Sequence, residues 1–484
     1  MDIQLSENNS VPPHLFTRLR RAPFVRYTDL FFRSKLHFML IGALTVLSNV
    51  FGLELPVYCC LIALGIYICL FGRDLLPLVP IIAVCYITPS RENNPGINED
   101  SIFYPENGGI LLLILVALFV AAVIFRLTLD PEIGRRNFLT AKRKLLSGIL
   151  VLGASYMLAG AFSGNYFENG WSNALFAFLQ FIAILLPYYL ISGSVKWEEA
   201  PSRYFAWTGI CVGFSLVIEI IAVYFIAHPI EGSDIDRNVI FTGWGNYNNM
   251  GGMLTMMIPF AFQLGCIKKK SWLYSLCGSL FLIGVLLTCS RTSIVVAVGI
   301  FALSMIELFL NSRYRRICVQ TNLIVFGSLA AIMLIFYYDV LVSYIEIFLI
   351  ERSIASRFAG FTEGIKQFMK YPIFGGSFFC KDYLLEEWSD VEAFTSFFPA
   401  RWHNTPIQMI ASCGIVGLLA YGFHRLQTVR LVLQKQTLEN TYITLSALAL
   451  LLTSLFDCHF FNIGPVLFYS MAMAFAEKLP TDAV

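Results

Sequence analysis

The stretch GILLLILVALFVAAVIF, residues 109–125, decides the fold class of this chain, because it contains no charged residue over a length that can cross a bilayer. Similar apolar runs, each of about 17–25 residues, recur along nearly the whole chain. The composition agrees with them: 57% of the 484 residues are hydrophobic and only 14% are charged, whereas soluble domains carry about 25% charged residues. These features predict an all-α fold, a polytopic bundle of transmembrane helices.

The apolar runs predict about 12–14 spans in a single transmembrane domain, residues 36–484. The runs lie near 36–53, 55–71, 74–89, 108–126, 145–163, 173–193, 204–227, 247–266, 272–289, 292–310, 319–339, 403–424, 438–456 and 462–477. Residues 1–35 form a basic leader, which we expect in the cytoplasm, either resting on anionic headgroups or acting as a flexible tail whose charges set the topology. No small-residue cleavage site follows the first apolar run, so we expect no cleavable signal peptide.

The positions of Lys and Arg predict the orientation of the bundle. With the N-terminus inside, 25 of the 34 basic residues fall in inner connectors and 9 in outer ones, as the positive-inside rule requires. The inner clusters include the group Arg425, Arg430 and Lys435. Both termini are therefore expected in the cytoplasm. The longest connector, residues 340–402, then forms one large extracytoplasmic loop.

The large loop contains a predicted amphipathic helix. Four apolar side chains recur in it at helical spacing: Phe358, Phe361, Ile365 and Phe368. The helix should extend over about three turns and end before Pro372 and the pair Gly375-Gly376. We expect it to lie on the membrane or to cap the bundle. The rest of the loop is rich in aromatic and acidic residues, and the spacing of its carboxylates predicts no metal site: Glu386, Glu387, Asp390 and Glu392.

His403 is the candidate catalytic residue. It follows Trp402 at the outer end of an expected span, with Asn404 beside it and Pro406 in the first turn. A histidine at the boundary between water and lipid can take a proton from a hydroxyl group. The alternative on these residues is an interfacial histidine that caps a helix.

Arginines on the outer side are the candidate ligands for an anionic substrate. Arg291 lies in LLTCSRTSIVVAVG, residues 286–299, between two expected spans with almost no loop. An arginine so close to the apolar layer is costly unless it faces a polar cavity or an anion, or snorkels to the headgroups. Arg237 lies shortly before the Gly/Asn-rich stretch GWGNYNNMGGML, residues 243–254. Two or three guanidiniums that converge on one cavity would suit a diphosphate, because the planar fork binds phosphate oxygens bidentately.

Three further ionisable residues have two interpretations each. Glu219 falls in the middle of an expected span, where a carboxylate marks a proton or substrate path or else hydrogen-bonds to a neighbour. Asp457 and His459, in FDCHFFN, either line the same outer cavity or are local turn residues. A transporter or flippase of lipid-linked oligosaccharide is therefore the alternative function. Only Glu219 favours it, since the sequence shows no inverted repeat.

Three stretches of the C-terminal half resemble the O-antigen ligase and O-antigen polymerase superfamily. They are SRTS at 290–293, RFAGFTEGIKQFMKYPIFGGSFF at 357–379 and HNTPIQMIASCGIVGLLAY at 403–421. A looser match runs from Arg237 through Gly243 to Asn246 and Asn248. The chain departs from the family pattern at Gly375-Gly376, where the family usually has Gly-x-Gly.

The resemblance implies a membrane glycosyltransferase of surface polysaccharide biosynthesis, at the outer face of the bacterial cytoplasmic membrane. Its donor would be a glycan linked to undecaprenyl diphosphate. Its acceptor would be a hydroxyl group on another lipid-linked repeat, a lipid core, or a protein or wall polymer. His403 would be the base, Arg291 and Arg237 would bind the diphosphate, and Arg357 is a weaker candidate for the same role. The family implies an inverting reaction that needs neither a metal nor a cofactor. Membrane lipids are expected partners and nucleic acid is not.

Overall fold

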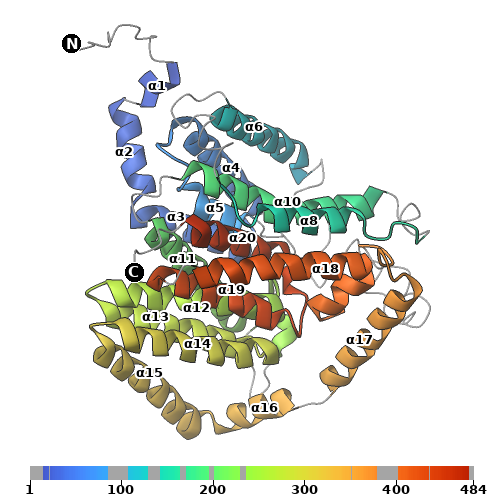
Figure 1. The fold of residues 1–484 in the computed structure, drawn as a ribbon. Coiled ribbons are helices and arrows are strands. Elements are labelled where there is room, and N and C mark those ends of the chain that lie inside the picture. The colour runs from blue at the N-terminus through green and yellow to red at the C-terminus, as the bar shows by residue number, and fades with distance from the viewer. Residues whose placement is uncertain are drawn as a thin grey trace, which may run out of the picture.

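The computed structural model describes residues 15–20, 22–85, 107–128, 142–163, 171–195, 201–228, 236–349, 352–378, 402–434 and 437–478. In these residues the protein consists of helices, apart from one two-stranded hairpin. Figure 1 shows the helices packed side by side in one bundle. The predicted all-α fold class is confirmed.

The N-terminal half supplies the upper part of the bundle in Figure 1. Its helices are α1 (Leu15–Arg20), α2 (Pro23–Phe32), α3 (Lys35–Phe51), α4 (Glu54–Phe71), α5 (Leu78–Val84), α6 (Gly109–Thr128), α8 (Leu146–Met157), α10 (Trp171–Ser194) and α11 (Pro201–Ala222). A turn of π-helix, η3 (Val223–Ala227), extends α11.

The C-terminal half begins with the turn η4 (Arg237–Val239) and the antiparallel hairpin of β1 (Phe241–Thr242) and β2 (Gly245–Asn246). Its helices are α12 (Tyr247–Ile267), α13 (Ser271–Leu287), α14 (Arg291–Asn311), α15 (Arg315–Phe336), α16 (Tyr338–Leu349), α17 (Arg352–Lys370), α18 (Thr405–Gln434), α19 (Leu438–Thr453) and α20 (Ile463–Lys478). The 3-10 turn η6 (His459–Phe461) joins the last two helices.

Eight of the described helices are long and apolar enough to cross a membrane, and α2 with α3, bent by 68°, would make a ninth crossing. Three further apolar helices, α8, α13 and α19, are shorter. The count by length is lower than the 12–14 expected spans because of these short helices and because α5 covers only 7 residues. The chain is a multi-pass membrane protein.

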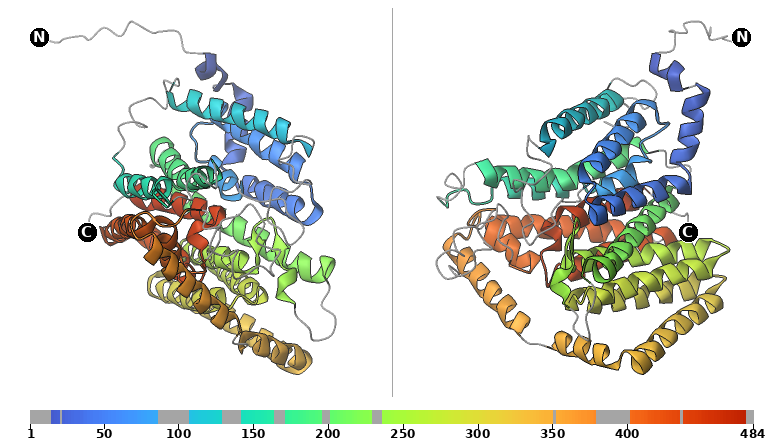
Figure 2. Two further views of the ribbon diagram at one scale, coloured as in Figure 1. Left: turned by 90° about the vertical axis from the view of Figure 1, so that its right-hand side faces the viewer. Right: turned by 180° about the vertical axis from the view of Figure 1, so that it is seen from behind.

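Helix α12 forms the centre of the C-terminal half. It packs against α11, α13, α14 and α19, and 89% of its apolar window is buried. In contrast, only 6% of the window of α15 is buried. Figures 1 and 2 show α15, α16 and α17 following one another along the edge of the bundle. This edge begins beside α13 and returns to the bundle at α18.

Helix α17 corresponds to the expected amphipathic helix but begins at Arg352, before the apolar pattern starts. Its apolar side chains Phe358 and Met369 point away from the described bundle, with 63% and 75% of their surface exposed. Its opposite side packs on α18, where Gly364 lies against Ile407 and Trp402. Gly364 and Gln367 therefore face the protein, while the exposed face of the helix carries both apolar side chains and the charged Lys366.

Two glycine-containing blocks of the sequence pack backbone against backbone. Helix α18 is broken at Gly414, where φ is 65° and ψ is −159°. The Gly376 N–H donates to the Ala411 carbonyl at 2.9 Å, and the Ile415 N–H donates to the Pro372 carbonyl at 2.8 Å. A Cβ at Gly414 would lie 2.3 Å from the Ile373 carbonyl oxygen, so only glycine fits here. The break divides α18 into a segment that begins beside His403 and a second segment that follows Gly414.

Candidate active site

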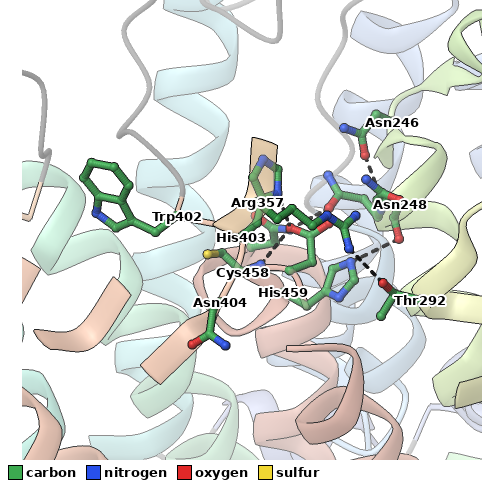
Figure 3. Close-up of polar contacts among 12 residues, drawn as sticks. Asn246, Asn248, Thr292, Arg357, Trp402, His403, Asn404, Cys458 and His459 are labelled. Atoms are coloured by element: carbon green, nitrogen blue, oxygen red, sulfur yellow. Dashed lines mark hydrogen bonds and ion pairs between the residues drawn. The ribbon is translucent and has the colours of Figure 1, made fainter. Parts of the chain in front are cut away.

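His403 and Asp457 face each other at the start of α18 and the end of α19. The Nδ1 atom of His403 lies 3.5 Å from Oδ1 of Asp457. The imidazole is 48% exposed, whereas the carboxylate is only 12% exposed. Figure 3 shows His403 beside Cys458 and His459 of the turn that follows α19. A half-exposed imidazole backed by a buried carboxylate can accept a proton from a bound hydroxyl.

Hydrogen bonds hold these two chain segments together. The Asn404 amide donates to the Leu455 carbonyl at 2.7 Å, and the Thr405 N–H donates to the Ser454 carbonyl at 2.8 Å. The Asn404 side chain also accepts from the Ile407 N–H and so caps the first turn of α18. His403 itself has a φ of 50°, which a residue with a Cβ rarely adopts. The surrounding bonds therefore hold the histidine in a strained backbone conformation.

The carboxyl group of Asp457 is held in its charged form. Burial by itself raises the pKa of this group. The hydrogen bond from His403, the charges that His459 and His403 can carry, and the bond from the Cys458 N–H act in the opposite direction and bring the pKa well below its usual range. The ionised carboxylate directs the Nδ1–H of His403 toward itself and leaves the Nε2 lone pair for a substrate.

His459, the second histidine of this turn, is buried and joined to α12. Its Nε2 lies 3.0 Å from the carbonyl oxygen of Asn248 and must donate, because a carbonyl can only accept. Burial lowers the pKa of His459, against the opposing effects of Asp457 and of the Asn248 bond. The side chain is only 1% exposed, so it cannot meet a hydroxyl acceptor from solvent. Its place is structural: it connects η6 to the first turn of α12.

Three of the predicted arginines converge on the N-terminal end of α14. The Nη1 atom of Arg357 donates to Oγ1 of Thr292 at 3.0 Å. The Nη1 atom of Arg237 donates to the Cys289 carbonyl at 3.4 Å, and its guanidinium lies 4.9 Å from the Tyr247 ring centre. Arg291 is the first residue of α14 and interacts electrostatically with both other arginines.

The three guanidiniums repel one another, and the N-terminus of α14 adds a partial positive charge. Such an arrangement favours a multiply charged anion, which would remove the repulsion. Arg357 also acts electrostatically on His459, which in turn acts on Asp457. Figure 3 shows Arg357 close to His403, His459 and Thr292.

Asn248 links the Gly/Asn-rich stretch to the SRTS motif. Its side-chain oxygen accepts from the Ser290 hydroxyl at 2.7 Å, and Ser290 is 3.0 Å from the Ser293 hydroxyl. Its carbonyl accepts from His459. The sequence identified both stretches as motifs but did not indicate that they are in contact. It also did not predict the roles of Thr292 and Tyr247, which contact two of the arginines and lie inside these motifs.

Glu219 is buried away from solvent and bonds to the hairpin. Its Oε1 accepts a hydrogen bond from the Trp244 indole N–H at 3.1 Å. Trp244 lies between β1 and β2, just before the residues that carry Tyr247 and Asn248. Of the two interpretations of Glu219, the structure therefore shows the local hydrogen bond.

Within the described ranges, no three His, Cys, Asp or Glu side chains gather closely enough to hold a metal ion. The acidic loop residues lie outside these ranges: Glu386, Glu387, Asp390 and Glu392.

A family model described as O-antigen ligase matches residues 276–422. This match agrees with the resemblance of the C-terminal half to the O-antigen ligase and polymerase superfamily. The matched region contains Arg291, Arg357 and His403, whereas Arg237 and Asp457 lie outside it. The match supports a membrane glycosyltransferase of polysaccharide biosynthesis, and the family implies a lipid-linked glycan as substrate and a glycan as acceptor. A search of curated proteins finds no match to the chain.

Proposed function

We propose that the chain transfers a glycan from undecaprenyl diphosphate to a hydroxyl acceptor, with inversion at the anomeric carbon and without a metal ion. The reaction takes place at the outer face of the bacterial cytoplasmic membrane, with both termini in the cytoplasm and residues 340–402 outside. The observation that carries this proposal is the convergence of Arg237, Arg291 and Arg357 beside the pair His403–Asp457. A diphosphate needs the first group, and a hydroxyl nucleophile needs the second.

In the proposed reaction, Nε2 of His403 takes the proton of the acceptor hydroxyl while its oxygen attacks the anomeric carbon. The bond from this carbon to the diphosphate oxygen breaks, and the electron pair leaves with the diphosphate. Attack opposite the leaving group in one displacement inverts the anomeric centre. Asp457, 3.5 Å from Nδ1, stabilises the imidazolium that forms.

The arginines act on the leaving group. Negative charge builds up on the bridging oxygen of the diphosphate as the bond breaks, and guanidinium donors fixed beforehand stabilise it without reorganisation. In this proposal Arg291, Arg357 and Arg237 supply the positive charge. The bond from Arg357 to Thr292 fixes the guanidinium from α17 against α14. The helix of the large loop thus completes the diphosphate site.

Transfer in proteoliposomes supplied with a lipid-diphosphate glycan tests the proposal. The native chain is compared with His403→Ala and Arg291→Ala at matched expression and folding. The matched controls are His228→Ala, an exposed histidine outside the site, and Lys366→Ala, a side chain 56% exposed on α17. We expect a loss of about 100-fold or more for the site variants, the range for a missing acid–base group. The controls should behave as the native chain. Native transfer rates in both site variants would contradict the proposal.

A further inference from the structure

The segment of α18 that follows Gly414 carries a cation that the proposed reaction does not use. This cation is Arg425. Its guanidinium carbon is 4.2 Å from the ring centre of Phe460, 4.8 Å from that of Tyr421 and 5.2 Å from that of Tyr469. Aromatic rings stabilise the faces of a guanidinium. The hydroxyl groups of Tyr421 and Tyr469 also interact with the guanidinium, but two of its nitrogen atoms remain without a partner.

The edge of the Arg425 guanidinium is the part that lacks acceptors. Its Nε and Nη2 atoms are buried and have no hydrogen-bond partner among the described residues. The N–H groups on these two atoms point in the same direction, and together they match two oxygens of one carboxylate or phosphate. Within the described part of the chain, no carboxylate forms an ion pair with Arg425. A guanidinium with buried N–H groups and no anionic partner is unfavourable.

A second buried donor comes from α8, where the ring of Tyr156 contacts that of Phe461 in η6 with 5.8 Å between the ring centres. Tyr156 of α8 is 0% exposed, and its hydroxyl has no partner among the described residues. It interacts electrostatically with Arg425, Tyr421 and Tyr469. His424, also 0% exposed, bonds through Nε2 to the Tyr469 hydroxyl at 3.1 Å and has an unpartnered Nδ1. Several buried polar atoms in this layer are therefore left for a ligand to satisfy.

We propose that Arg425 and Tyr156 form an internal oxyanion-binding site inside the bundle, between α8, α18 and η6. The site takes one carboxylate or phosphate group, either as a free anion or as part of an anionic lipid headgroup. The fork of Arg425 binds two oxygens, and the Tyr156 hydroxyl donates to the same group. The site is separate from the arginines at α14. The turn η6 lies between them: Phe460 contacts Arg425, while its neighbour His459 contacts Asn248.

Phosphate titration of the purified full-length chain tests this site. The arginines at α14 are expected to bind phosphate as well, so variants of both regions are compared. They are Arg425→Gln and the double variant Arg291→Gln with Arg357→Gln. The control is Arg430→Gln, on the exposed side of the same helix as Arg425. By calorimetry we expect two phosphates per chain for the native protein and for the control. We expect one for Arg425→Gln and one for the double variant. Equal stoichiometry in Arg425→Gln and the native chain overturns the free-anion form of the proposal.

Native mass spectrometry distinguishes the lipid source. If an anionic lipid occupies the site, the native chain and Arg430→Gln retain one such lipid in vesicle-derived preparations containing phosphatidylglycerol, and Arg425→Gln does not. Delipidation should then raise the phosphate stoichiometry of the native chain from one to two. If Arg425→Gln matches the native chain in both phosphate and lipid, the site does not exist.

Should Arg425→Gln fail to fold, Tyr156→Phe keeps the ring and removes only the hydroxyl. It is measured in the double-variant background, where only the inner site remains. We expect phosphate affinity there to fall about ten-fold, the effect of losing one hydrogen bond to a charged group. Unchanged affinity overturns the role of Tyr156 and the proposed binding geometry with it.

Discussion

Arg357 and Arg425 are both arginines packed near α18, yet their guanidiniums meet opposite surroundings. Arg357 donates a hydrogen bond to the Thr292 hydroxyl and lies near two further arginines. The nearby His403 is half-exposed, so solvent reaches this region. Arg425 lies under three aromatic rings, with its fork buried. The first environment brings several positive charges together, which suits an anionic ligand that binds and dissociates. The second isolates one charge in a low dielectric, where any bound anion becomes part of the structure.

The largest expected effect concerns the outer region. Asp457→Asn removes the charge that stabilises the His403 imidazolium, and we expect kcat to fall about 100- to 10,000-fold with little change in KM. Steady-state transfer in proteoliposomes measures it, with Glu363→Gln on α17 as a matched acid-to-amide control. A kcat within a few-fold of native would show that His403 acts without its carboxylate.

The next prediction exchanges the two arginines directly. Arg291→Gln should lower kcat/KM for the lipid-diphosphate donor about 100-fold while leaving the melting temperature unchanged or higher, because one of three mutually repelling charges is gone. Arg425→Gln should leave kcat and KM within about two-fold, because no step of the reaction uses it. Transfer kinetics and thermal unfolding in detergent check both. If Arg425→Gln loses transfer as strongly as Arg291→Gln, the two regions are one site.

Gly414 separates the two regions, so changing it should affect only the outer one. In Gly414→Ala the new Cβ meets the Ile373 carbonyl oxygen, and the residue must keep a φ of 65°. We expect a destabilisation of about 2–4 kcal/mol and roughly ten-fold slower transfer, because the segment that begins at His403 shifts. Phosphate binding at Arg425 should persist. Gly422→Ala, at a position with open space around it, is the control.

The smallest expected effect is a pH dependence of stability. Burial lowers the pKa of His459 in the folded chain, so the unfolded chain binds more protons between that lowered value and about 6.5. Native stability should therefore fall as the pH drops below about 6.5, by up to about 1.4 kcal/mol per pH unit for this group. His459→Gln should show a shallower slope. Asp457 does not contribute here, since its depressed pKa affects stability only below the usual carboxyl range. Equal slopes would exclude His459 as the source.

Much of the helical arrangement could be predicted because hydrophobic runs of membrane length have few alternatives. The expected span 247–266 became α12 (Tyr247–Ile267), and 292–310 became α14 (Arg291–Asn311). The prediction was poorer for α5 and for the start of α17. Local patterns there are short, and packing against neighbouring helices decides where a helix begins and ends.

The candidate site could be predicted only in part. His403 and Arg291 stood out because a charged or titratable residue next to an apolar run has few inexpensive positions. Asp457 had two interpretations, because its partner lies 54 residues earlier in the chain. No local pattern could show that the turn after α19 meets the start of α18. The charge pattern could not show the surroundings of Arg425, because it counts basic residues and takes no account of the rings that can surround them.

The sequence by itself determined that the chain is a helical membrane protein and which motifs contain its polar groups. The reason is that the length of an apolar segment and the positions of charged residues are local properties, and these decide whether the segment is stable in a bilayer. Tertiary structure alone decided which of these groups meet. It brought three arginines to one end of α14, set His403 against Asp457 and buried Arg425 among rings from α18, η6 and α20. Such contacts depend on the packing of distant helices, which the close fit of side chains determines and no single segment encodes.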